Sequence, residues 1–145
     1  MKLSKELTNG FIIFLGISIY FLFINAIGYG DKAYLRMFNG VFVLYGVNRT
    51  LKMNISEGKV NFVSNAISAI KTSLIGVFLS VIGLLIFSYI NGGDSYVQNL
   101  PKTFLFTGNP TIVDFCLSLL FEGVASSVIV ALLLMLYWND KYKAD

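Results

Sequence analysis

Three long apolar runs constrain what this chain can fold into. Residues 10–29 and 73–90 contain no charged side chain, and residues 115–137 contain one, Glu122. Crossing the ~30 Å hydrocarbon core of a bilayer takes about 20 mostly apolar residues in a helix. Each run is too long and too continuously apolar for a buried strand or for a helix with one apolar face. The runs therefore predict membrane-spanning helices.

The composition agrees with this prediction. Of the 145 residues, 56% are hydrophobic and 13% are charged, whereas a soluble domain has about 25% charged residues. A small soluble domain has too high a surface-to-volume ratio to bury so much apolar side chain. The composition excludes an ordinary soluble domain, a disordered chain and a secreted module held by disulfides.

The cysteine and histidine content restricts the chemistry. Cys116 is the only cysteine, so no disulfide can form within the chain, and there is no histidine. Histidine is the commonest metal ligand and the usual general base, so its absence excludes histidine-held haem, zinc proteases and Ser-His-Asp hydrolysis. The sequence contains no phosphate loop, dinucleotide fingerprint or metal-ligand spacing. We therefore expect a non-catalytic protein without a cofactor or a metal.

A fourth, weaker segment occupies residues 33–51. Its apolar part is short and is interrupted by Asn39 and two glycines, and Arg36 and Arg49 bracket it. Arginine can extend its charged head to the membrane surface along an apolar stem, which would let a short helix cross. The sequence thus predicts a single domain, residues 1–145, folded as an all-α membrane bundle of four helices. The predicted spans are 10–29, 33–51, 73–90 and 115–137.

The placement of basic residues tests this count. With four spans and both termini in the cytoplasm, eight lysines and arginines lie inside and three outside, as the positive-inside rule requires. This placement accounts for the net charge of +3 without a nucleic-acid partner. A three-span chain with its N-terminus outside gives the same division, so that alternative stays open. We favour four spans because three would carry Lys2 and Lys5 across the membrane.

Two of the predicted loops have their own character. Residues 61–72 carry apolar side chains along one helical face, which is typical of a short helix on the cytoplasmic leaflet. The same pattern fits an N-terminal extension of the third span, and both interpretations stay open. Residues 91–111 form the outer loop, and aromatic side chains there are expected at headgroup depth, in a loop that re-enters or follows the interface. These aromatics are Tyr96, Phe104 and Phe106.

Glu122 is the most informative residue within a predicted span. A carboxylate near the middle of a membrane helix costs about 2.5–3.5 kcal/mol on insertion scales, so it usually faces the bundle interior and has partners. The sequence offers no basic side chain as its counter-ion. We expect an intramembrane polar cluster that joins Glu122 to neighbouring amides and hydroxyls. Its expected members are Asn25, Asn39, Ser88, Ser118 and Ser126.

Two functions fit such a cluster. In the first, Glu122 is a hydrogen-bonded lock between helices or the contact point for a partner. In the second, it is a protonatable or cation-binding site in a small transporter or channel subunit.

Small residues give a separate indication of how the helices pack, because they let helix backbones approach closely in a membrane. We expect the third and fourth spans to pack together through them, with docking of another subunit as the alternative. These residues are Gly76, Ser80, Gly83, Gly123 and Ser127.

The layout resembles a group of small bacterial four-span inner-membrane proteins known only as a domain of unknown function. The shared features are the short first turn at 30–32, the sequence GKVNF at 58–62 and the glycine and serine spacing within 75–80. The resemblance implies a four-helix bundle in a bacterial inner membrane and no particular activity. We expect a multi-pass accessory or structural subunit of a larger membrane complex. Its expected partners are the lipid bilayer and either other membrane subunits or further copies of itself.

Overall fold

The fold is an all-helical bundle. The computed structural model describes residues 3–103, 105 and 108–143, and the only β pairing among them is one isolated bridge between Asn61 and Lys143. The four long helices are α1 (Lys5–Ala26), α2 (Asn39–Ser56), α3 (Phe62–Ile90) and α5 (Ile112–Tyr137). The short helical segments are η1 (Ala33–Phe38), α4 (Asp94–Gln98) and η2 (Asn139–Lys141).

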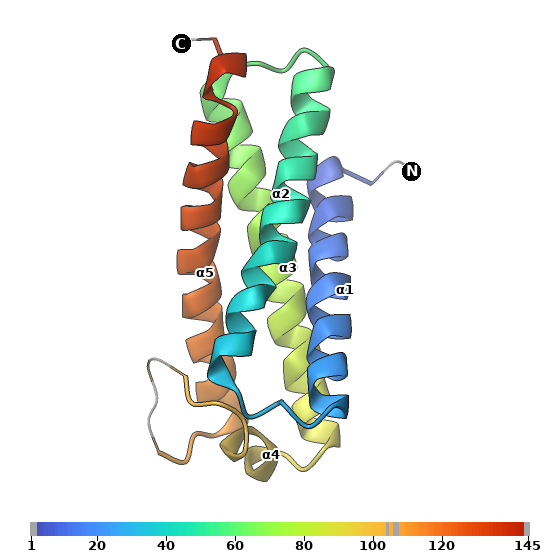
Figure 1. Ribbon diagram of the computed structural model, residues 1–145, viewed down its shortest axis with the longest axis vertical. Helices are drawn as coiled ribbons and strands as arrows, with labels where there is room; N and C mark the ends of the chain where they lie inside the picture. The colour runs from blue at the N-terminus through green and yellow to red at the C-terminus, as the bar shows by residue number, and fades with distance from the viewer. Residues whose placement is uncertain (1–2, 104, 106–107, 144–145) are drawn as a thin grey trace.

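The long helices run alternately down and up, as Figure 1 shows, so both ends of the chain lie at the same end of the bundle. The helix α1 packs against α2 and α3, and α5 packs against the same two helices. The helices α2 and α3 also contact each other, so they form the middle of the bundle with α1 and α5 on its flanks. Sequential antiparallel neighbours joined by short connections are the usual solution for a helical bundle.

Three helices are long and apolar enough to cross a membrane: α1, α3 and α5. They correspond to the three apolar runs, so the prediction that each run forms one long apolar helix is confirmed. The helix α2 does not belong to this set, and its second half carries Arg49, Lys52 and two amide side chains. The bundle therefore consists of three strongly apolar helices and one amphipathic helix packed among them.

The helices extend beyond the apolar runs. The helix α3 is continuous from Phe62, with the Asn61 side chain accepting a hydrogen bond from the Ser64 amide (2.8 Å). Residues 62–72 are thus an N-terminal extension of the third apolar helix, and they do not form a separate interfacial helix. The helix α2 also differs from the expected range, because residues 33–38 form a 3₁₀ segment and the α-helix continues to Ser56.

The outer loop folds back along α5. The carboxylate of Asp94 accepts from the Ile112 amide (2.8 Å), and the Leu105 amide donates to Ser118 Oγ (3.4 Å). Tyr96 is half-buried and packs edge-on against Phe87 with ring centroids 5.7 Å apart. The other two aromatics expected at headgroup depth, Phe104 and Phe106, lie outside the described residues.

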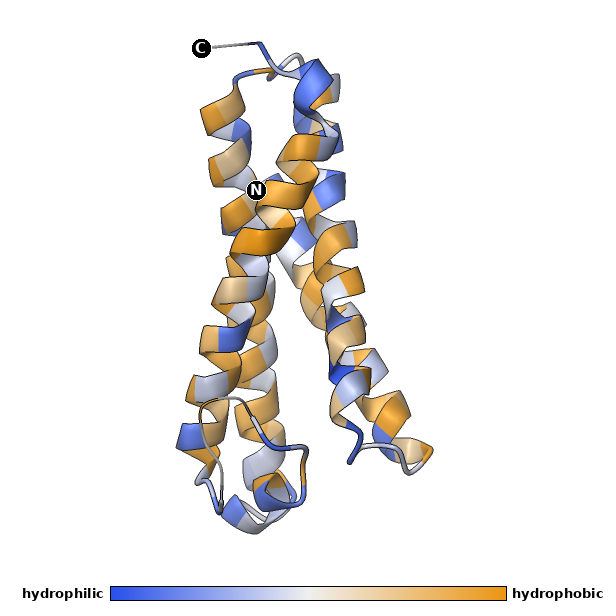
Figure 2. Cartoon of the chain, turned by 60° about the vertical axis from the view of Figure 1, so that its left-hand side comes forward, coloured by the Kyte–Doolittle hydropathy of each residue, from blue (hydrophilic) through white to orange (hydrophobic). Residues whose placement is uncertain are grey.

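The outer surface of the bundle is strongly apolar. Figure 2 shows hydrophobic residues along the length of the long helices, with hydrophilic residues at both ends and at a smaller number of positions between them. An exposed apolar surface of this extent marks a membrane or a protein interface. Exposed large side chains on the three apolar helices include Phe11, Ile19, Phe23, Ile82, Ile86, Phe121, Ile129, Leu132 and Leu136.

Candidate functional site: two polar clusters and a groove

Glu122 forms an ion pair near the outer loop. Its Oε2 lies 3.3 Å from Nη2 of Arg36, and each side chain is 28% exposed. Arg36 also donates to the carbonyl oxygens of Pro101 and Lys102, at 3.5 Å each. This outer polar cluster of Glu122, Arg36 and two loop carbonyls joins η1, the outer loop and α5.

The expectation that Glu122 has no basic counter-ion was wrong. The sequence predicts Arg36 at the membrane surface, because it stands at the edge of an apolar stretch. The structure places it in a 3₁₀ segment that lies beside α5, where the returning outer loop also reaches it. The guanidinium can satisfy two carbonyls and a carboxylate together, because it carries five N–H donors in a fixed plane.

Two of the expected partners donate to main-chain carbonyls of their own helices. Asn25 donates to the Phe21 carbonyl of its own helix (2.8 Å), and α1 lies across the bundle from α5. Ser126 is exposed, and its hydroxyl donates to the main-chain carbonyl of Glu122 (2.8 Å). Asn25 is therefore on a helix that does not pack against α5, whereas the Ser126 hydroxyl bonds to the main chain of Glu122 one helical turn away.

Of the remaining expected members, Ser88 and Ser118 are buried and Asn39 is half-buried. Ser118 is fully buried and accepts from the Leu105 amide, so it ties α5 to the outer loop. Ser88 is also fully buried. Among the described residues, Ser88 Oγ and Asn39 Oδ1 have no hydrogen-bond partner. Unsatisfied buried polar atoms of this kind cost about 1–3 kcal/mol each.

A second set of polar residues, absent from the sequence prediction, lies near the end that carries the termini. Asn9 Nδ2 donates to Thr50 Oγ1 (2.9 Å), and Thr50 Oγ1 lies 3.0 Å from Thr72 Oγ1. Asn54 Nδ2 donates to Asn65 Oδ1 (3.2 Å). All five side chains are buried. We call them the inner polar cluster; it joins α1, α2 and α3.

This cluster continues to the surface through charged residues. Lys5 donates to Asn54 Oδ1 (3.0 Å) and forms an ion pair with Glu57, which Lys59 also approaches at 3.4 Å. The hydrogen bond from Lys5 is the main reason that the pKa of Glu57 lies below its usual value. Ser68 donates to the carboxylate of Glu6 (3.0 Å). Charged side chains thus connect α1 to α2 and α3 at the surface end of the inner polar cluster.

The glycines of the bundle accept side chains from neighbouring helices. Ile13 of α1 is fully buried between Gly46 of α2 and Gly76 of α3, and a Cβ on Gly76 would lie 2.5 Å from its Cγ2. A Cβ on Gly83 would lie 2.9 Å from the ring of Phe14 of α1.

Among the other expected packing residues, Gly123 faces α3. A Cβ there would lie 2.5 Å from Val77 Cγ1. Ser80 and Ser127 donate to the carbonyls of Gly76 and Gly123 in their own helices, at 2.7 and 2.8 Å. The small residues therefore bring α3 close to α1 as well as to α5.

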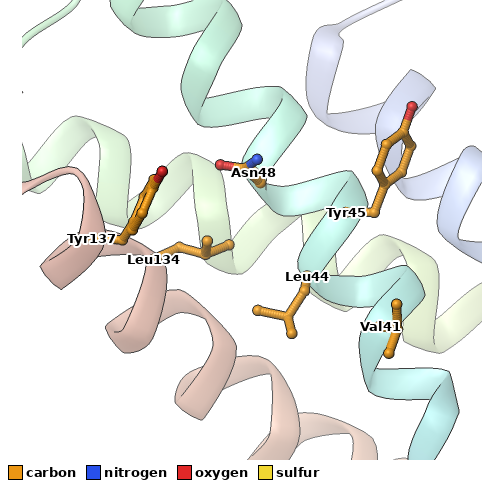
Figure 3. A pocket seen from close by; sticks show the side chains of 6 residues that line it. All are labelled: Val41, Leu44, Tyr45, Asn48, Leu134 and Tyr137. Carbon is orange, nitrogen blue, oxygen red and sulfur yellow. The ribbon is translucent and has the colours of Figure 1, made fainter.

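An open groove of about 360 Å³ runs between α2 and α5. Figure 3 shows Leu44, Asn48 and Leu134 between the two helices, with Tyr45 and Tyr137 on opposite sides. Val41 completes the lining. The indole N–H of Trp138 donates to Asn48 Oδ1 (2.8 Å), which links α5 to α2 beside the groove.

The described residues contain no group of three or more histidine, cysteine, aspartate or glutamate side chains that could hold a metal ion. Cys116 is buried in α5, where it packs in an apolar cluster with Val97, Ile112 and Phe115. No protein-family model, no curated protein and no solved structure matches the chain.

Proposed function

We propose that this chain is a multi-pass protein of a bacterial inner membrane in which α1, α2, α3 and α5 all cross the bilayer. The alternating direction of the helices supports this proposal, because it makes α2 antiparallel to two apolar neighbours. A helix of 18 residues is about 27 Å long, close to the ~30 Å hydrocarbon thickness. The 3₁₀ segment η1 lengthens it at the outer end.

The basic residues support an orientation with both termini in the cytoplasm. Lys5, Lys52, Lys59 and Lys141 belong to the end of the bundle that carries the termini. Lysine and arginine are retained on the cytoplasmic side of membrane proteins. The opposite end has fewer basic residues, and one of them, Arg36, is paired with Glu122.

The function that fits this bundle best is that of a non-catalytic accessory or structural subunit of a larger membrane complex. The observation that carries the proposal is the pairing of interior polar groups across helices, while apolar side chains face outward. Polar pairs of this kind hold membrane helices together. The helices contain most of the chain, which leaves little of it outside the bilayer for a soluble active site.

Purification from the native membrane tests this function. The full chain, carrying an affinity tag after its last residue, is extracted in mild detergent and its co-purifying proteins are quantified. We expect another membrane protein at a fixed ratio to the tagged chain. Recovery of the chain alone, from several mild detergents and after cross-linking in the membrane, would contradict the subunit proposal.

A small transporter or channel subunit is the second candidate, and the ion pair between Arg36 and Glu122 favours it. Charged groups within membrane segments often mark ion or proton pathways. If this candidate is correct, vesicles containing the chain conduct protons or cations, and Glu122→Gln abolishes the flux. Equal flux through vesicles with the wild-type chain, with Glu122→Gln and without protein eliminates it.

A further inference from the structure

The groove between α2 and α5 has an apolar wall and a basic end. Val41, Leu44 and Leu134 supply the apolar part of its lining. On α2, Lys52 follows Asn48 by four residues, so it lies one turn further along the same helix face. On the other side, Lys141 in η2 follows Tyr137 by four residues. Both lysines are exposed and stand at the end of the bundle that carries the termini.

The charge at this end of the groove is positive. Among the described residues, the ion pairs involve Lys5, Lys32, Arg36 and Lys59, and they include neither Lys52 nor Lys141. Asp140 adds one negative charge beside Lys141, whereas exposed Arg49 adds a further positive charge next to Asn48. The net charge beside the groove thus favours an anion.

Aromatic side chains mark the expected depth of the membrane surface at the same place. Tyr137 lines the groove and packs edge-on against Trp138, with ring centroids 5.2 Å apart. Tyrosine and tryptophan are enriched where the hydrocarbon core meets the headgroups. The apolar wall therefore extends into the hydrocarbon region, and the two lysines stand at headgroup level.

We infer that the groove between α2 and α5 binds an anionic phospholipid from the cytoplasmic leaflet. One acyl chain lies along Leu44 and Leu134, and the phosphate group lies between Lys52 and Lys141. The inference rests on the proposed membrane insertion with the termini inside. Basic sites between membrane helices on the cytoplasmic side recognise such headgroups, because charge attraction adds to the burial of the acyl chain.

The position of Trp138 makes the site measurable, because it is the only tryptophan in the chain and it contacts a residue of the groove. The full chain is reconstituted into phosphatidylcholine vesicles that contain either brominated phosphatidylglycerol or brominated phosphatidylcholine. Bromine quenches tryptophan fluorescence on contact, so the two titrations give the relative affinity of the site for the anionic lipid. A basic residue near the surface contributes about fivefold to that affinity, so we expect a preference of fivefold or more.

The test variant changes both lysines beside the groove to glutamine, Lys52→Gln and Lys141→Gln. We expect it to lose the preference for anionic lipid, so that the two brominated lipids quench equally. Lys71→Gln is the matched control, because Lys71 is an exposed lysine on α3 and α3 contributes nothing to the groove. This control retains the wild-type preference. Because all three side chains are exposed, none of these changes removes a packing contact from the core.

Three results would overturn the inference. Equal quenching by both lipids in the wild-type chain shows that the groove does not select anionic lipid. A preference that survives the double change shows that the phosphate binds elsewhere. Quenching by neither lipid shows that lipid does not reach the groove, as happens when a partner chain covers it. A separate measurement tests whether alkaline carbonate extracts the protein from the membrane. Extraction would contradict the proposed membrane insertion, whereas the three results above contradict only the lipid site.

Discussion

At the scale of single residues, the close approach of helices depends on glycines that leave room for a neighbour's side chain. Ile13 is the clearest example, because it is fully buried and contacts glycines on two other helices. In a bilayer, lipid provides no hydrophobic driving force between helices, so such packing contributes much of the stability. The contribution of each glycine to stability therefore depends on which atoms a Cβ at its position would contact.

Gly76→Ala is expected to destabilise the bundle. The new Cβ would lie 2.5 Å from Cγ2 of Ile13, and overpacking of a close-packed interior costs about 1–3 kcal/mol. Gly40→Ala is the control, because no atom lies within 4 Å of a Cβ at that position. Denaturant titration of the detergent-solubilised chain, followed by circular dichroism, measures both. Equal unfolding free energies for the two variants would show that the contact with Ile13 is unimportant.

Thr50 lies at the centre of the inner polar cluster, since its hydroxyl contacts both Asn9 and Thr72. Thr50→Val keeps the shape of the side chain but removes the acceptor for the Asn9 amide. An unsatisfied buried polar group costs about 1–3 kcal/mol, so we expect a loss of that size in the free energy of unfolding. Thr8→Val is the control, because Thr8 is exposed and its hydroxyl donates to the carbonyl of Ser4, the N-cap residue of its own helix. A loss no greater than in that control would contradict the assigned role.

The sequence predicted only part of the two polar clusters. Glu122 stood out because it is charged within an apolar run, and the structure does give it a polar partner. The inner polar cluster gave no such signal. The sequence places Thr50 near the end of a predicted span and Asn54 in a loop. It places Asn65 and Thr72 in residues 61–72, as part of a helix on the membrane surface or of an extension of the third span. Uncharged amides and hydroxyls are ordinary in loops, so only the helical geometry reveals that they meet.

At the scale of elements, the apolar runs located the long helices better than they located the helix ends. The helix α3 starts eleven residues before its apolar run because Asn61 caps it and because Asn65 and Thr72 have partners on α2. A hydropathy pattern cannot show such cross-helix bonds. The same limitation applies to α2, whose polar second half continues as helix to Ser56.

The ion pair between Arg36 and Glu122 is expected to hold the outer loop and η1 against α5. Glu122→Gln removes one charge and leaves the partly buried guanidinium of Arg36 without its counter-ion. The expected loss lies between the ~1 kcal/mol of an exposed pair and the roughly 3–5 kcal/mol of a buried one. The double variant with Arg36→Gln and Glu122→Gln lacks both charges. It should therefore recover part of the lost free energy of unfolding. Unfolding free energies of the four proteins give the coupling energy, and a coupling near zero would contradict this role.

At the scale of the whole molecule, both termini lie at one end of a bundle whose four long helices alternate in direction. The C-terminal segment is tied to that end, since the Lys143 amide donates to the Val60 carbonyl (3.0 Å) and Tyr142 packs edge-on against Phe62. The alternation follows from chain connectivity, because each of the three connections between long helices reverses the direction of the chain. The number of spans depends on α2, which has the weakest hydropathy of the four.

Reporter insertions decide whether α2 crosses the membrane. A reporter enzyme that is active only outside the cytoplasm is inserted after Asp31, between α1 and α2, or after Glu57, between α2 and α3. Four spans place these positions on opposite sides, so we expect activity at Asp31 and none at Glu57. Insertion after Asn99, in the outer loop, should restore activity and serves as the control for expression. If α2 lies along the surface instead, Asp31 and Glu57 share one side and report alike. The polar groups of α2 would then have to be satisfied by water, whereas Thr50 and Asn54 are buried and bonded to other helices. That burial is the physical reason to expect different signals from the two positions.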